Sequence, residues 1–207
     1  HGWNMTEWDY QSFSATMFKR LWWQGFQGRF ASVRWPTFSG DEFRIDLQNS
    51  YSGRTYNLSE FRAYRSGKGV ANYLKSLRAR YPDYRIGLCA HSMGNVVMTE
   101  ALRLLAGEGQ RPIDNYVLMQ AAFPAHAYDP NLRDPTLVDS QFGRPTPNSY
   151  AEYSIGIGGG VTGNIVNFYN VNDFALQTGR IIWRQLESNW FANQRDVKPD
   201  NRDAIIP

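Results

Sequence analysis

Cysteine and histidine are scarce in this chain of 207 residues, which has one cysteine and three histidines. A single cysteine excludes an internal disulfide framework. It slightly favours the cytoplasm, but the localisation stays unknown on this ground alone. No group of histidine, cysteine and acidic residues has metal-ligand spacing, so we expect neither a metal nor a cofactor. Cys89 itself lies in an apolar run and is expected to be a small core residue.

Long apolar runs and blocks of one charge are also missing. The formal net charge of +3 is spread along the chain. We therefore expect no membrane span and no nucleic-acid-binding surface. Aromatic residues make up 15% of the chain, which suits a packed core beside an apolar cleft. The length fits a single domain, residues 1–207, and indicates nothing about oligomeric state.

The pattern of apolar residues alternates between the periods of helices and strands. Strands alternating with helices predict an α/β fold with a mostly parallel, doubly wound sheet and helices on both faces. In the helix at 58–79, Gly67 and Gly69 are expected to weaken the middle. The expected helices span 8–23, 58–79 and the residues after Ser92, and the expected strands span 30–35, 84–90, 116–122 and 164–171. The apolar side chains of the helix at 8–23 are expected to pack into the core, and the strand at 164–171 is expected to be buried.

Ser92 lies between an apolar strand pattern and a helical one. Ala90 and Gly94, two positions to either side, are small enough for strand and helix to approach each other. A serine on such a sharp strand-to-helix turn is a nucleophile elbow, here with alanine in place of the first glycine. The simpler alternative is that Ser92 only caps the following helix. The surrounding strand and helix favour the elbow.

The first residues, His1-Gly2-Trp3, add a second motif. A His-Gly loop, then a helix, then a serine elbow resembles the α/β-hydrolase superfamily. The resemblance implies that the backbone N–H groups of Trp3 and Met93 form an oxyanion hole. It also implies that His1 holds the loop and is not the proton shuttle. Taken without the elbow, His1-Gly2 is an ordinary dipeptide.

Further sequence motifs make the resemblance more specific. Trp35-Pro36 ends an expected strand, and Asp173-Phe174-Ala175-Leu176 follows another. Together with the elbow at 90–95, these pieces look similar to a bacterial group of esterase- or lipase-like α/β-hydrolases of unknown function. The similarity runs through nearly the whole chain in order.

Asp173 is the candidate catalytic acid. It directly follows the expected strand at 164–171, and catalytic groups of parallel sheets gather where strands end. It also comes after Ser92, as the order Ser, Asp, His requires. Asp173 could equally cap the next helix, and Asp129 is the competing acid.

The general base is missing from the expected position, because no histidine follows Asp173. We therefore expect the chain to be a fragment that lacks the first strands of its domain and the final segment bearing the catalytic histidine. That histidine would lie beyond residue 207, and the fragment by itself would be inactive. His126 is an alternative base from another loop, because geometry defines a triad and not chain order. His91 is expected to turn away from Ser92 and, with Ala90 and Gly94, to support the elbow.

Residues 124–163 show no strong period and are rich in Pro, Gly, Tyr and Asn. We expect a long loop or a lid over the cleft. The sequence thus predicts a serine hydrolase that cleaves a carboxylic ester, lipid ester or thioester of a small molecule through an acyl-enzyme. The alternative from another class is a non-catalytic α/β-hydrolase-like domain used for binding or scaffolding.

Overall fold

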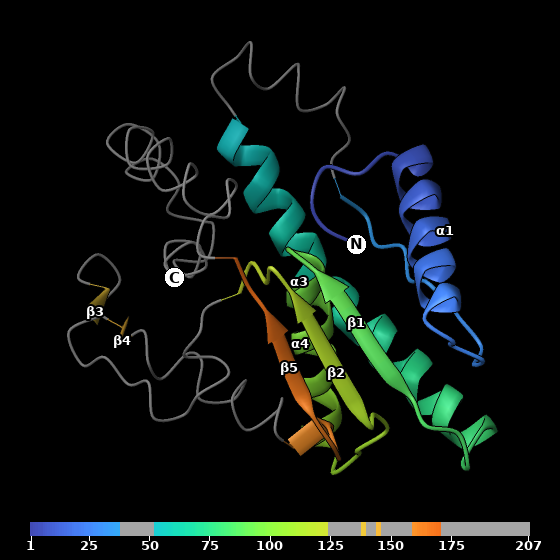
Figure 1. Cartoon of the computed structure of the whole chain (residues 1–207). Coiled ribbons are helices and arrows are strands. Elements are labelled where there is room, and N and C mark those ends of the chain that lie inside the picture. Colours follow the sequence, from blue (N-terminus) through green and yellow to red (C-terminus); the bar gives the residue numbers. More distant parts are fainter. Residues whose placement is uncertain (38–51, 124–137, 140–143, 146–158, 171–207) are drawn as a thin grey trace.

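The computed structural model describes residues 1–37, 52–123, 138–139, 144–145 and 159–170. Three strands form a parallel sheet in the order β1-β2-β5, and β3 and β4 form a short antiparallel pair (Figure 1). The elements are α1 (Glu7–Trp23), α3 (Ser52–Arg80), β1 (Gly87–His91), α4 (Gly94–Gly107), β2 (Asn115–Met119), β3 (Val138–Asp139), β4 (Arg144–Pro145) and β5 (Ile165–Phe168).

Helices lie on both faces of the sheet. Ala90 of β1 is level with Leu118 of β2, and both side chains are buried on the face that α4 covers. His91 points to the opposite face, where its ring lies 6.2 Å from the ring of Phe13 in α1. The predicted α/β class with a doubly wound parallel sheet is confirmed.

Helix α3 packs closely on α4 at Gly67. A Cβ at this position would lie 2.6 Å from Cγ of Glu100 and 3.1 Å from the backbone N of Ala101. Only glycine allows the two helices to approach this far. Helix α3 runs unbroken for 29 residues from Ser52 to Arg80, so neither Gly67 nor Gly69 interrupts it, and the expected loss of helix stability at these glycines stays a prediction.

Helix α1 begins one residue before its predicted start and ends where predicted. Its start is fixed by a capping box, in which the backbone N–H of Asp9 donates to Thr6 Oγ1 and the backbone N–H of Thr6 donates to the Asp9 carboxylate. None of its residues is buried, so the expected packing of its apolar side chains into the core is wrong. The reason is that α1 reaches the sheet at His91 and otherwise lies against His1 and residues 26–35, as in the ring contact of Phe18 with Phe30.

The predicted strand at 30–35 is not a strand in the structure. This segment pairs with no other strand that the structure describes, and the backbone N–H of Trp35 donates instead to the side chain of His1. A strand requires a ladder of main-chain hydrogen bonds. In this segment the buried Trp35 instead holds the loop at His1 and Gly2.

The two later strands are confirmed with shifted ends. β2 ends at Met119 because Gln120 adopts a positive φ of 45°. β5 forms where expected, but its four residues are exposed and not buried. It pairs only with β2 among the described residues, and its Phe168 lies on the same exposed sheet face as Met119. Cys89 also lies on that face and is exposed, so its predicted place in the core is wrong.

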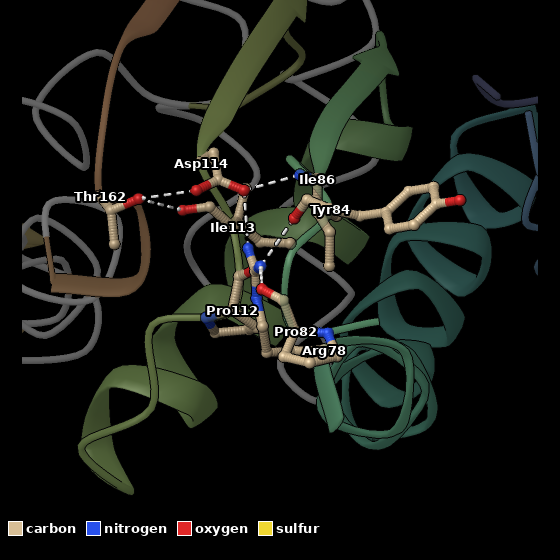
Figure 2. Close-up of polar contacts among 8 residues, drawn as sticks. All are labelled: Arg78, Pro82, Tyr84, Ile86, Pro112, Ile113, Asp114 and Thr162. Carbon is tan, nitrogen blue, oxygen red and sulfur yellow. Dashed lines mark hydrogen bonds and ion pairs between the residues drawn. The ribbon is translucent and has the colours of Figure 1, made fainter. Parts of the chain in front are cut away.

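An ion pair and the hydrogen bonds around it connect the segments just before the strands, at the end of the sheet opposite the serine turn (Figure 2). Asp114, just before β2, accepts from Arg78 of α3 at 2.6 Å and from the backbone N–H of Ile86, just before β1, at 2.6 Å. Thr162, ahead of β5, donates its hydroxyl to the carbonyl of Ile113 at 3.1 Å. The guanidinium also donates to three backbone carbonyls, those of Pro82, Tyr84 and Pro112.

Candidate active site

Ser92 occupies a sharp turn between β1 and α4. Its φ is 51°, a left-handed conformation that costs a non-glycine residue about 1–2 kcal/mol. Its backbone N–H donates to the carbonyl of Met119 at 3.0 Å, so the turn is fixed to the end of β2. The residue is partly exposed at the carboxyl ends of the parallel strands. This is the strand, turn and helix that the sequence predicts.

The small residues around the turn are required by close contacts. A Cβ on Gly94 would lie 2.5 Å from the carbonyl oxygen of His1, which is closer than any real Cβ contact. A Cβ on Gly2 would lie 3.0 Å from Cβ of Ser92 and 3.5 Å from its Oγ. Ala90 is buried beneath. The loop at His1-Gly2 therefore interlocks with the serine turn.

His1 is held by Trp35. The Trp35 backbone N–H donates to His1 Nε2 at 3.2 Å, and the indole N–H donates to the His1 carbonyl at 2.9 Å. The two rings stack with centroids 5.3 Å apart. The other ring nitrogen, Nδ1, lies 2.9 Å from the Gly2 carbonyl. With Nε2 accepting and Nδ1 donating, the imidazole is neutral and fixed, so His1 holds the loop.

His91 lies beside the turn but is turned toward other partners. Its Nε2 is 3.3 Å from Oε1 of Gln120, and its Nδ1 lies 3.1 Å from where a Cβ on Gly2 would be. Its ring also contacts Phe13. Its side chain therefore faces away from the α4 side of the sheet and packs between the His-Gly loop, α1 and the end of β2.

Backbone strain is concentrated at this end of the sheet. The non-glycine residues with positive φ among the described residues are Asn4, Ser92 and Gln120, with φ of 59°, 51° and 45°. Asn4 ends the His-Gly loop, and Gln120 begins the loop after β2. Such conformations persist only where the surroundings enforce them, and they cluster at functional sites.

Two buried polar side chains beneath the serine turn were not predicted from the sequence. Asn95 and Tyr116 are fully buried and joined by a hydrogen bond of 2.8 Å from the Tyr116 hydroxyl to Asn95 Oδ1. The amide nitrogen of Asn95 donates to the carbonyls of Ala90 and Ser92. A polar residue in the first turn of an apolar helix was the available signal, but nothing in the sequence pointed to Tyr116.

The residues expected to supply the two oxyanion donors are Met93, which follows Ser92, and Trp3, which follows Gly2. Met93 is buried at the N-terminal end of α4, where backbone N–H groups and the helix dipole favour negative charge. Among the described residues, no main-chain carbonyl accepts from the Met93 N–H. Trp3 directly follows Gly2, which packs on the Ser92 side chain. Met93 is thus the neighbour of Ser92 in the chain, and Trp3 is the neighbour of the glycine that contacts Ser92.

Some of the predicted site lies outside the described residues. This applies to Asp173, His126 and Asp129, and to most of the expected lid at 124–163. From that region, Gly160 packs on α4, where a Cβ would lie 3.0 Å from a methyl carbon of Leu102.

Cys89, three residues before Ser92, has no features of a second nucleophile. Desolvation raises the pKa of its thiol, which disfavours the reactive thiolate. Its Sγ lies 3.7 Å from Sδ of Met119. In the part of the chain that the structure describes, no group of three or more His, Cys, Asp or Glu side chains could hold a metal ion. None of the described helices is long and apolar enough to span a membrane.

Comparison with known proteins gives one match. A family model described as an alpha/beta hydrolase of unknown function (DUF900) matches residues 1–141, a range that contains the His-Gly loop, the serine turn and β2. No curated protein and no solved structure matches the chain.

Proposed function

The chain belongs to this alpha/beta hydrolase family of unknown function, and on that premise we propose that it is a serine hydrolase that cleaves ester-type bonds. The observation that carries the proposal is the left-handed Ser92 on a turn from β1 into α4, with its side chain packed against Gly2. A helix cap would need neither the strained backbone nor the interlocked loop. A nucleophile that must stand above the sheet edge needs both.

The proposed reaction is acyl transfer to water. Ser92 Oγ forms a bond to the substrate carbonyl carbon while a histidine takes its proton. The carbonyl electrons form an oxyanion, which accepts from the N–H groups of Met93 and Trp3. The histidine then protonates the leaving alcohol or thiol as its bond to the acyl carbon breaks. A water molecule repeats the sequence and releases the acid, leaving Ser92 as it began.

The proposed base is neither of the two histidines that the structure describes. His1 has both ring nitrogens engaged, and His91 is bonded to Gln120, so neither is placed to serve Ser92. Asp173 is proposed to orient the base, with Asp129 and His126 as the alternative acid and base. The proposed substrates are carboxylic esters, lipid esters or thioesters of small molecules.

Labelling with a fluorophosphonate probe tests the nucleophile. The protein expressed from its complete gene should be labelled, and Ser92→Ala should abolish both labelling and ester hydrolysis. Ser76→Ala is the matched control, because Ser76 is an exposed serine on α3 that should not affect labelling. The probe phosphonylates an activated serine only, so binding alone gives no signal.

Two results would contradict the proposal. Labelling that survives in Ser92→Ala would assign the nucleophile to another residue. A folded protein that is neither labelled nor active on ester substrates would favour the non-catalytic binding or scaffolding domain. Circular dichroism and thermal unfolding of each variant would establish that it is folded.

A further inference from the structure

The carbonyl of Ser92 is held by an unusual number of donors. It accepts from the backbone N–H of Asn95 at 3.0 Å, from the side-chain Nδ2 of Asn95 at 2.9 Å, and from the backbone N–H of Ala122 at 3.2 Å. A carbonyl oxygen has two lone pairs, so this acceptor is saturated. The donors come from the first turn of α4 and from the loop after β2.

Asn95 is itself fixed on both sides. Its Nδ2 also donates to the carbonyl of Ala90 at 3.2 Å, and its Oδ1 accepts from the Tyr116 hydroxyl at 2.8 Å. Asn95 and Tyr116 are both 0% exposed. A buried amide without partners is unfavourable by several kcal/mol, whereas here both of its ends are bonded. The bond from Tyr116 also fixes which end of the amide faces Ser92.

The geometry of the peptide bond links this carbonyl to the oxyanion donor. The Ser92 carbonyl and the Met93 N–H belong to one planar trans peptide, in which they point in opposite directions. Any group that fixes the carbonyl therefore fixes the direction of the N–H. Donors on the carbonyl also polarise the peptide and strengthen its N–H as a donor.

We propose that Asn95, oriented by Tyr116, is a positioning residue for the oxyanion hole that acts through the Ser92–Met93 peptide. The role rests on the function proposed above. Asn95 does not touch the substrate. It holds the carbonyl of Ser92 on the buried side of the turn, so that the N–H of Met93 faces the opposite side, where the oxyanion forms.

Three variants of the protein expressed from its complete gene test the role. Asn95→Leu removes the side-chain donor while it keeps the number and branching of the side-chain heavy atoms. Tyr116→Phe keeps the donor and removes only the group that orients it. Val97→Ala is the control, because Val97 is a fully buried residue of the same helix without a polar group. It lowers stability without removing a hydrogen bond at the turn.

Three quantities are measured on each variant: kcat and KM for a p-nitrophenyl ester, and the inhibition constant of a trifluoromethyl ketone. The ketone forms a hemiketal oxyanion on the serine, so its affinity reports the oxyanion hole, while KM is dominated by ground-state binding. Complete loss of one oxyanion donor lowers kcat by about 100- to 1,000-fold. In Asn95→Leu the donor is misdirected and not lost. We therefore expect kcat and ketone affinity each to fall by about 10- to 100-fold, while KM stays within about twofold of the wild-type value. Tyr116→Phe should give a smaller loss of the same kind.

The outcomes separate the positioning role from the proposed function. If wild type is active and Asn95→Leu matches Val97→Ala in kcat and ketone affinity, Asn95 is structural only and the positioning role is wrong. If Asn95→Leu raises KM as much as it lowers kcat, the loss is general disorder of the site and the role is also wrong. If wild type itself is neither active nor labelled, the serine hydrolase proposal fails, and the positioning role fails with it.

Discussion

Trp35 holds His1 through both its main chain and its ring. The backbone N–H and the indole N–H donate to two different atoms of His1, and the indole stacks on the imidazole with an angle of 8° between the planes. Gly2, the next residue, lies against Ser92. The position of the loop beside the serine therefore depends on a tryptophan that lies 34 residues away in the chain.

The first prediction concerns this contact. Trp35→Phe should keep ring stacking and the backbone hydrogen bond but lose the indole donor to the His1 carbonyl. We expect a loss of about 1 kcal/mol in the free energy of unfolding and slower labelling of Ser92 by a fluorophosphonate. Trp22→Phe, at an exposed site of α1, is the control and should leave both unchanged. Equal labelling rates in the two variants would mean that the loop does not depend on this bond.

The second prediction compares two glycines of α3. Gly67→Ala places a Cβ in contact with Glu100 and the backbone of Ala101, which cannot move away. Gly69 has no atom within 4 Å of its Cβ position. Gly69→Ala should therefore stabilise by about 0.5–1 kcal/mol through helix propensity, while Gly67→Ala should destabilise despite the same gain. Urea unfolding measures both, and a stabilising Gly67→Ala would contradict the close contact.

The third prediction concerns the strain at Ser92. Ser92→Ala and Ser92→Gly should both be inactive, but only glycine adopts a φ of 51° without strain. Glycine at this position relieves about 1–2 kcal/mol of backbone strain in the folded state. The greater conformational freedom of glycine in the unfolded chain offsets part of this gain. We expect Ser92→Gly to be more stable than Ser92→Ala by about 0.5–1 kcal/mol. Thermal unfolding of the pair at neutral pH is the measurement, and equal midpoints would indicate a relaxed turn.

The fourth prediction concerns Asp114. Partial burial raises the pKa of this carboxyl, but the bonds from the Ile86 N–H and the Arg78 guanidinium outweigh it and hold the pKa below 3.8. The folded state thus binds this proton less readily than the unfolded state. The resulting stabilisation is complete above the unfolded pKa and is lost as the pH falls through the folded pKa.

Asp114→Asn should therefore be less stable than wild type at pH 7 by about 1–3 kcal/mol, and the difference should shrink below pH 4. Asp83→Asn, at an exposed position of the nearby turn, is the control. Unfolding by urea at a series of pH values measures the difference. A difference that stays constant down to pH 2 would exclude a role for ionised Asp114.

The site was predictable where its parts are close in sequence. The strand, the serine turn and the helix all lie within residues 84–107, and their apolar pattern and small residues are local signals. The family resemblance added the His-Gly loop. The contact of this loop with Trp35 could not be predicted, because Trp35 and His1 belong to segments that meet only in the fold.

The wrong predictions have a common physical cause. Apolar spacing indicates a helix or strand but not what covers it, so α1 and β5 were expected to be more buried than they are. The close contact of Gly67 with α4 was not predicted, because helix propensity alone does not indicate it. The bond from Arg78 to Asp114 spans 36 residues, and no local pattern predicts such a pair.

β1 is only five residues long, yet one end contributes to stability and the other is proposed to contribute to activity. Just before its start, the Ile86 N–H donates to Asp114, which also accepts from Arg78, and just after its end stands the strained Ser92. In a deep mutational scan scored separately for abundance and for activity, substitutions at the start should lower both scores together. Small substitutions at Ser92, such as Ser92→Ala, should abolish activity and change abundance little. About 20 Å of extended chain, from Ile86 to Ser92, would thus separate positions selected for stability from positions selected for chemistry.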